Sequence, residues 1–121
     1  MNSISDLLGK TVVDITQVLN DELIFKTNCG RAYKMYHYQD CCECVEIEEI
    51  IGNLADLINS PILMAEEVSQ DDDNASESGT WTFYKLATLQ GYVTIRWYGQ
   101  SNGYYSESVD LKEIALREEA Q

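Results

Sequence analysis

The histidine and the four cysteines of the chain are the residues best suited to metal or thiol chemistry. His37 precedes Cys42 and Cys44, and Cys29 lies earlier in the chain. Structural zinc takes four nitrogen or sulfur ligands, and its paired cysteines are usually separated by two to four residues. Only one residue separates Cys42 from Cys44, so their spacing is not the usual one for structural zinc. On a strand, however, the two side chains would share a face and could bind one ion with His37. His37, Cys42 and Cys44 are therefore the candidate metal ligands. The alternative is that Cys29 and Cys41 are small buried apolar residues and that the other two cysteines are incidental thiols.

Acid–base catalysis is the second chemistry that the residue types allow. His37 could act as a general base if a carboxylate such as Asp40, Glu43, Glu66 or Glu67 oriented its ring. The sequence has no Gly-x-Ser-x-Gly elbow, no His-Glu-x-x-His motif and no glycine-rich phosphate loop. The sequence therefore predicts a non-catalytic protein without a cofactor.

A third group of side chains near the end of the chain could recognise a ligand. Tyrosine, tryptophan and arginine dominate binding hot spots, and together they can stack on a base and hold a phosphate. This composition favours a small-molecule binder that sequesters a nucleotide signal, unless the residues only pack a hairpin. The candidate ligand-binding residues are Arg96, Trp97, Ser101, Asn102, Tyr104 and Tyr105.

Acidic residues outnumber basic ones by 21 to 8, which gives a formal net charge of −13. No Lys or Arg occurs between positions 35 and 84. Such a chain repels phosphate backbones and attracts cationic partners, so we expect no direct nucleic-acid binding but a protein partner with a basic surface. The alternative is that the acids form an ordinary solvated surface. The candidate partner-binding residues are Asp40, Glu43, Glu46, Glu48, Glu66, Glu67, Asp71, Asp72 and Asp73.

The elements that must position these groups are mostly strands. At 121 residues with 45% hydrophobic residues, the chain predicts a single domain over 1–121. Alternating segments predict an α+β fold: an antiparallel twisted sheet of about six to eight strands, with two hairpins in series over 81–109. One or two short helices are expected at 3–9 and 52–59. Residues 69–79 are expected to form a flexible acidic loop and residues 112–121 a charged tail, as a frayed helix.

The start of the chain lacks a basic and then apolar signal segment, and no run of 18 apolar residues occurs. We therefore expect a cytoplasmic protein with no membrane association, whose cysteines remain thiols. If the protein forms a homodimer, the sheet edges and tyrosine-rich faces are the expected contacts.

Three segments are distinctive together: His-Tyr-Gln-Asp-Cys-Cys-Glu at 37–43, Trp-Thr-Phe-Tyr at 81–84 and Ser-Asn-Gly-Tyr-Tyr-Ser at 101–106. With these motifs the chain resembles, over about residues 8–110, a family of small uncharacterised proteins of bacteriophages and prophages. The resemblance implies a phage accessory protein that acts on host proteins or host defence.

The function favoured by charge and resemblance together is inhibition by binding. We expect a phage protein that blocks a host defence factor, of the anti-CRISPR or another anti-defence type, by covering its basic nucleic-acid-binding surface. The nucleotide binder and the zinc-binding or thiol-based protein remain the two alternatives.

Overall fold

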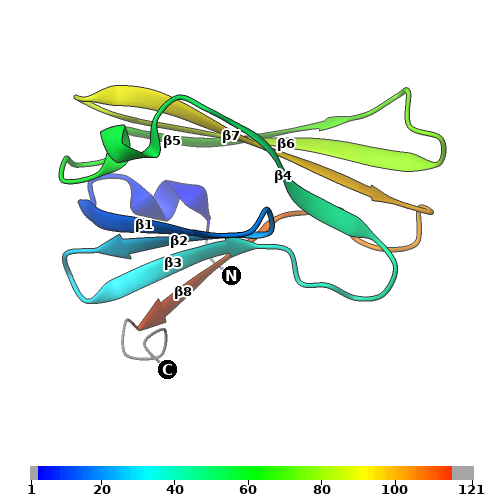
Figure 1. Ribbon diagram of the computed structural model, residues 1–121, viewed down its shortest axis with the longest axis horizontal. Coiled ribbons are helices and arrows are strands. Elements are labelled where there is room, and N and C mark those ends of the chain that lie inside the picture. Colours follow the sequence, from blue (N-terminus) through cyan, green and yellow to red (C-terminus); the bar gives the residue numbers. More distant parts are fainter. Residues whose placement is uncertain (1–2, 116–121) are drawn as a thin grey trace.

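The computed structural model describes residues 3–115 and shows two antiparallel sheets stacked face to face (Figure 1). The first, sheet 1, has the strand order β1-β2-β3-β8, and the second, sheet 2, has the order β4-β7-β6-β5. The strands are β1 (Val12–Val18), β2 (Glu22–Thr27), β3 (Arg31–Tyr36), β4 (Cys44–Ile51), β5 (Met64–Asp71), β6 (Ser78–Thr88), β7 (Gly91–Ser101) and β8 (Asp110–Ala115).

The expected α+β class is wrong, because the described residues contain no α-helix. The helical segments are two single 3₁₀ turns, η1 (Ile4–Leu7) and η2 (Leu54–Leu57). Each begins at a capping side chain: Ser3 accepts the Ser5 N–H before η1, and Asn53 accepts the Ala55 N–H before η2. The protein is an all-β sandwich with two short turns at its margins.

The predicted helix at 52–59 fails because its ends hold non-helical backbone. Gly52 has a φ of 108°, and a Cβ there would lie 2.7 Å from the Tyr92 carbonyl oxygen. Asn59 has a φ of 66°, and Pro61 follows. The helical spacing of the apolar residues therefore spans only one turn, whose Leu57 is fully buried.

The core lies between the two sheets and is formed by the alternate, inward-facing residues of both. Trp97 is fully buried, and its indole N–H donates to the Met35 sulfur of sheet 1 at 3.2 Å. Other large, fully buried side chains of the same core are Phe25, Leu23, Tyr84, Leu86, Ile95 and Val93, with Leu7 from η1. Trp97 thus joins the two layers by packing and by its hydrogen bond.

Three segment predictions near the ends of the strands need correction. The acidic loop expected over 69–79 is shorter: 69–71 belong to β5, 78–79 to β6, and only 72–77 connect them. The second hairpin, expected to return over 104–109, does not form, because 102–109 are irregular and lead to β8 in the other sheet. The expected helical tail is a β-strand over 112–115, and its remainder lies outside the described residues.

A search of residues 3–115 finds no helix with the length and apolar character needed to cross a membrane.

Replacing Trp97 by alanine should lower the free energy of unfolding by about 3–5 kcal/mol, because the substitution leaves a cavity between the sheets. The control Trp81→Ala removes a half-buried tryptophan from the outer face of sheet 2 and should cost about 1 kcal/mol. Urea denaturation followed by circular dichroism measures both. Equal losses would contradict the assignment of Trp97 to the core.

Candidate functional site

Charge is distributed unequally between the two sheets. The strands of sheet 1 carry four acidic and four basic residues, whereas the strands of sheet 2 carry six acidic and two basic ones. The acids of sheet 2 are Glu46, Glu48, Glu49, Glu66, Glu67 and Asp71, and its bases are Lys85 and Arg96. Asp72, Asp73 and Glu77 add to this excess in the β5–β6 connection. Sheet 2 is therefore the anionic half of the protein.

The outer face of sheet 2 also carries aromatic side chains. Since Trp97 and Ile95 point into the core, their neighbours on β7 point outward. The strand register places Phe83 opposite Arg96, Trp81 opposite Tyr98, and Val68 of β5 opposite Phe83. We call Val68, Trp81, Phe83, Arg96 and Tyr98 the outer aromatic patch.

Close contacts hold the outer aromatic patch in one arrangement. The rings of Trp81 and Tyr98 have centroids 4.4 Å apart, and the Arg96 guanidinium lies 5.4 Å from the Trp81 ring. The Tyr98 hydroxyl donates to the Asp72 carboxylate at 2.7 Å, which raises the pKa of Tyr98. A patch fixed by such contacts loses little side-chain freedom when a partner docks.

A β-bulge positions the carboxylates on the β4 side of the patch. The pairing of β4 with β7 shifts register between Ile47 and Glu49. Glu48 and Glu49 consequently both reach Arg96, with the Arg96 Nε–H donating to Glu48 at 2.7 Å and a terminal N–H donating to Glu49. The positive charge of the patch is thus balanced from within the sheet.

Eight of the nine predicted partner-binding acids lie at the surface, but they do not form one cluster. Glu46, Glu48 and Glu66 border the outer face of sheet 2, while Glu67 and Asp71 point to the opposite side of β5. Glu43 is only 4% exposed, so its prediction as a partner contact does not fit its position. The sequence could not reveal this burial, because the acceptor role of Glu43 depends on the turn before β4.

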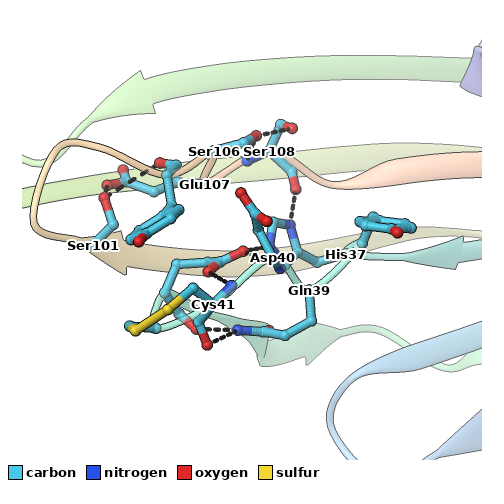
Figure 2. Close-up of polar contacts among 12 residues, drawn as sticks. His37, Gln39, Asp40, Cys41, Ser101, Ser106, Glu107 and Ser108 are labelled. Atoms are coloured by element: carbon cyan, nitrogen blue, oxygen red, sulfur yellow. Dashed lines mark hydrogen bonds and ion pairs between the residues drawn. A yellow bond between two sulfur atoms is a disulfide. The ribbon is translucent and has the colours of Figure 1, made fainter.

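His37 and Glu43 form a buried pair between the β3–β4 connection and residue 108 (Figure 2). The His37 Nε2 lies 2.7 Å from a Glu43 carboxylate oxygen, and both side chains are at most 4% exposed. The His37 Nδ1–H donates to the Ser108 carbonyl oxygen at 2.7 Å. Both ring nitrogens of His37 therefore have a hydrogen-bond partner.

Backbone groups complete the hydrogen bonding of Glu43. Its carboxylate accepts the N–H groups of Asp40 at 2.8 Å and Cys41 at 2.9 Å. The Gln39 side chain closes the turn by donating to the Glu43 carbonyl oxygen at 2.7 Å. The hydrogen bond from His37, followed by those from Cys41 and Asp40, lowers the pKa of Glu43 from 4.5 to about 2, against the opposing effect of burial. The arrangement holds a loop and leaves His37 no free ring nitrogen for catalysis.

The residues predicted as metal ligands are not brought together. Among residues 3–115, no three His, Cys, Asp or Glu side chains are placed to hold a metal ion. Cys29 lies in the β2–β3 turn, at the opposite end of sheet 1 from the β3–β4 connection (Figure 1). Cys44 is exposed as a free thiol at the start of β4.

Cys41 and Cys42 form a disulfide, so the prediction of four thiols is wrong for this pair (Figure 2). The prediction rested on a cytoplasmic location, where cysteines stay reduced. On a strand, adjacent side chains would also point to opposite faces. Residues 41 and 42 instead lie in a bend before β4, which brings the two sulfur atoms to the same side. Both residues are exposed, and so is Cys29, which was considered as a buried apolar residue.

The predicted ligand-binding residues divide between separate regions. Arg96 belongs to the outer aromatic patch, while Trp97 is buried beneath it. Asn102 and Tyr104 are exposed in the β7–β8 connection, and Tyr105 is half-buried. No single ligand can contact Trp97 and the others together.

Ser101 belongs to a polar cluster that the sequence did not predict. Its hydroxyl donates to the carboxylate of Glu107 (Figure 2). The Thr80 hydroxyl donates to the same carboxylate, and Glu107 is 8% exposed. Burial favours the neutral acid, but the hydrogen bonds from Ser101, Thr80 and Ser78 outweigh it and lower the pKa of Glu107.

Trp81, Phe83 and Glu49 are site residues that the sequence analysis did not identify. The alternation of Trp81 and Phe83 indicated that both lie on one face of a strand. Their position next to Arg96 could not be predicted, because it depends on the strand register.

Comparison with known proteins gives one match. Residues 5–111 match a family model described as "Domain of unknown function (DUF7448)". No curated protein and no solved structure matches the chain.

The Glu43 carboxyl should produce a pH-dependent stability. Because its pKa is lower in the folded state, its contribution is complete above about pH 4.5 and is lost as the pH falls toward about 2. Glu43→Gln should flatten this part of the profile, and Glu46→Gln, an exposed neighbour on β4, should leave it unchanged. Urea unfolding at intervals across this pH range measures the slopes. An unchanged slope in Glu43→Gln would contradict the assignment.

Thiol titration should distinguish the two kinds of cysteine. The native protein should release two equivalents of chromophore from dithiobis(nitrobenzoate), and the reduced, unfolded protein four. Cys29→Ser and Cys44→Ser should each remove one native equivalent. A hydrogen bond with Thr27 lowers the pKa of Cys29, so its alkylation should persist to lower pH than that of an ordinary exposed cysteine. Four native equivalents would contradict the disulfide.

Proposed function

We propose that this chain, which belongs to the DUF7448 family of domains of unknown function, is a non-catalytic protein that binds and blocks a basic surface of another protein. The observation that carries the proposal is the outer aromatic patch, with carboxylates of β4 on one side and Glu66 of β5 on the other. Aromatic and arginine side chains supply contact area, and the surrounding acids favour a cationic partner.

The proposed partner is a host factor whose basic surface binds nucleic acid. Carboxylates along the two margins of sheet 2 offer negative charge to the same Lys and Arg side chains that would hold phosphates. The neutral balance of charge in the strands of sheet 1 supports a single binding side, since steering toward sheet 2 then orients the encounter. The partner and nucleic acid would compete for one surface.

The resemblance to phage and prophage proteins supplies the biological setting of the proposal. In that setting the chain acts in the cytoplasm of an infected or lysogenic bacterium, and its target is a defence factor of the CRISPR or another type. The nucleotide-binding alternative receives less support, because Glu48 and Glu49 already occupy the guanidinium that a phosphate would need.

Trp81→Ala should weaken partner binding by at least about tenfold, because it removes the central ring of the patch. Tyr36→Ala is the matched control: Tyr36 is half-buried on sheet 1, with the Lys34 ammonium 4.9 Å from its ring. The immobilised wild-type protein and both variants are incubated with nuclease-treated bacterial lysate, and the captured proteins are identified by mass spectrometry.

A supporting result has three parts. A nucleic-acid-binding protein is retained by the wild type and by Tyr36→Ala and lost with Trp81→Ala. It is released by high salt and by added nucleic acid. Its purified form loses nucleic-acid binding when the chain is added. Equal capture by all three proteins, or capture that is insensitive to salt, would overturn the proposal.

A further inference from the structure

Sheet 2 has one open edge, at β5. The other edge strand of this sheet, β4, is interrupted by its bulge, and the Ile47 N–H on β4 donates to the Asn20 carbonyl oxygen of the β1–β2 turn. In contrast, β5 pairs in an unbroken register with β6, and no strand of residues 3–115 pairs with its other side. Its residues 66–71 are all exposed.

The register identifies the backbone groups that face away from the sheet. The Asp72 N–H donates to the Gly79 carbonyl oxygen, so the residues of β5 at even positions exchange hydrogen bonds with β6. The N–H and C=O groups of Glu67, Ser69 and Asp71 therefore point outward. Within residues 3–115, no backbone hydrogen bond reaches these groups. They form a template for another strand.

The side chains of β5 decide which strand can add. The exposed segment 66–71 lacks the proline, glycine and lysine residues that commonly protect edges, and it carries Glu66, Glu67 and Asp71. A second copy of this chain would set these carboxylates against each other across the new pair, which is unfavourable. A lysine or arginine in the same place would be attracted to them.

We infer that β5 is a docking edge for an extended, basic segment of a partner protein, which adds to sheet 2 as a further antiparallel or parallel strand. The backbone edge of β5 can bind such a segment whether or not the outer aromatic patch binds a partner. On the outer face the added strand places apolar side chains beside Val68, while its basic side chains lie on the inner face, near Glu67 and Asp71.

A pocket behind the edge can accept side chains from the other face of the added strand. Glu67 and Ser69 line this pocket of about 320 Å³, together with Glu107 and the hydroxyls of Ser106 and Ser108. Its lining contains two carboxylates, several hydroxyl groups and no cationic side chain. A lysine of the added strand that points inward would find hydrogen-bond acceptors there.

The test uses a fluorescent peptide, acetyl-Thr-Lys-Val-Lys-Val-Lys-Thr-amide, and the same peptide with alternate backbone nitrogens methylated. Both carry the same charge, but the methylated peptide lacks the N–H groups along one edge that strand addition needs. Fluorescence anisotropy measures binding to the full-length chain. Ser69→Pro removes an outward N–H and adds a ring at the edge without removing a bond to β6. Ser69→Ala is the matched control.

We expect the unmethylated peptide to bind the wild type and Ser69→Ala, and to bind Ser69→Pro at least about tenfold more weakly. Hydrogen exchange should slow at Glu67, Ser69 and Asp71 in the complex. Thermal unfolding checks that Ser69→Pro remains folded, and if it does not, the methylated peptide and the exchange data decide. Equal binding of both peptides, or of both variants in the folded state, would overturn the docking edge.

The outcome also separates this inference from the proposed function. If the edge fails, Ser69→Pro binds the unmethylated peptide as well as Ser69→Ala does, whatever Trp81→Ala does to lysate capture. If only the proposed function fails, Trp81→Ala captures the same proteins as the wild type, while the peptide still distinguishes the two Ser69 variants.

Discussion

The burial of Trp97 between the sheets is the constraint on which the outer aromatic patch depends. Successive side chains of a strand point to opposite faces. Because Trp97 is fully buried and its indole donates inward to Met35, its neighbours Arg96 and Tyr98 must point outward. The paired strand β6 then aligns Trp81 and Phe83 with them. A core residue thus determines the composition of the surface above it.

Sheet 2 carries two distinct surface features. Its outer face presents a fixed aromatic cluster with an internally neutralised arginine, and its β5 edge presents unpaired backbone with acidic side chains. Carboxylates suit both, since they keep the protein soluble, oppose pairing between identical edges and leave attraction to cations intact. The excess of negative charge on one sheet is therefore compatible with a folded, unassociated protein.

Alternation in the sequence was enough to predict most strands, because a half-buried strand must repeat every two residues. The segments around Val45 and Ile47, and from Val93 to Trp97, are buried and exposed as the pattern predicted. The expectation of one sheet with helices failed because apolar residues near Leu54 follow helical spacing for only one turn, between Gly52 and Asn59.

The candidate site was less predictable, since it depends on contacts between distant strands. Eight of the nine candidate partner-binding acids lie at the surface, and the exception is Glu43, which accepts a hydrogen bond from His37 that only the folded turn creates. Grouping Trp97 with Arg96 by proximity in sequence placed one core residue among surface residues. Trp81 and Glu49 could not be assigned to the site from sequence. Trp81 lies there because of the register between β6 and β7, and Glu49 because of the β-bulge in β4.

The His37–Glu43 pair has a mechanical consequence. His37 follows β3 of sheet 1, Glu43 precedes β4 of sheet 2, and Ser108 lies on the return from β7 to β8. One imidazole ring therefore joins, by hydrogen bonds, the two connections that cross between the layers at the same corner of the sandwich. The hydrogen bonds of this ring therefore oppose shear of one layer over the other at that corner.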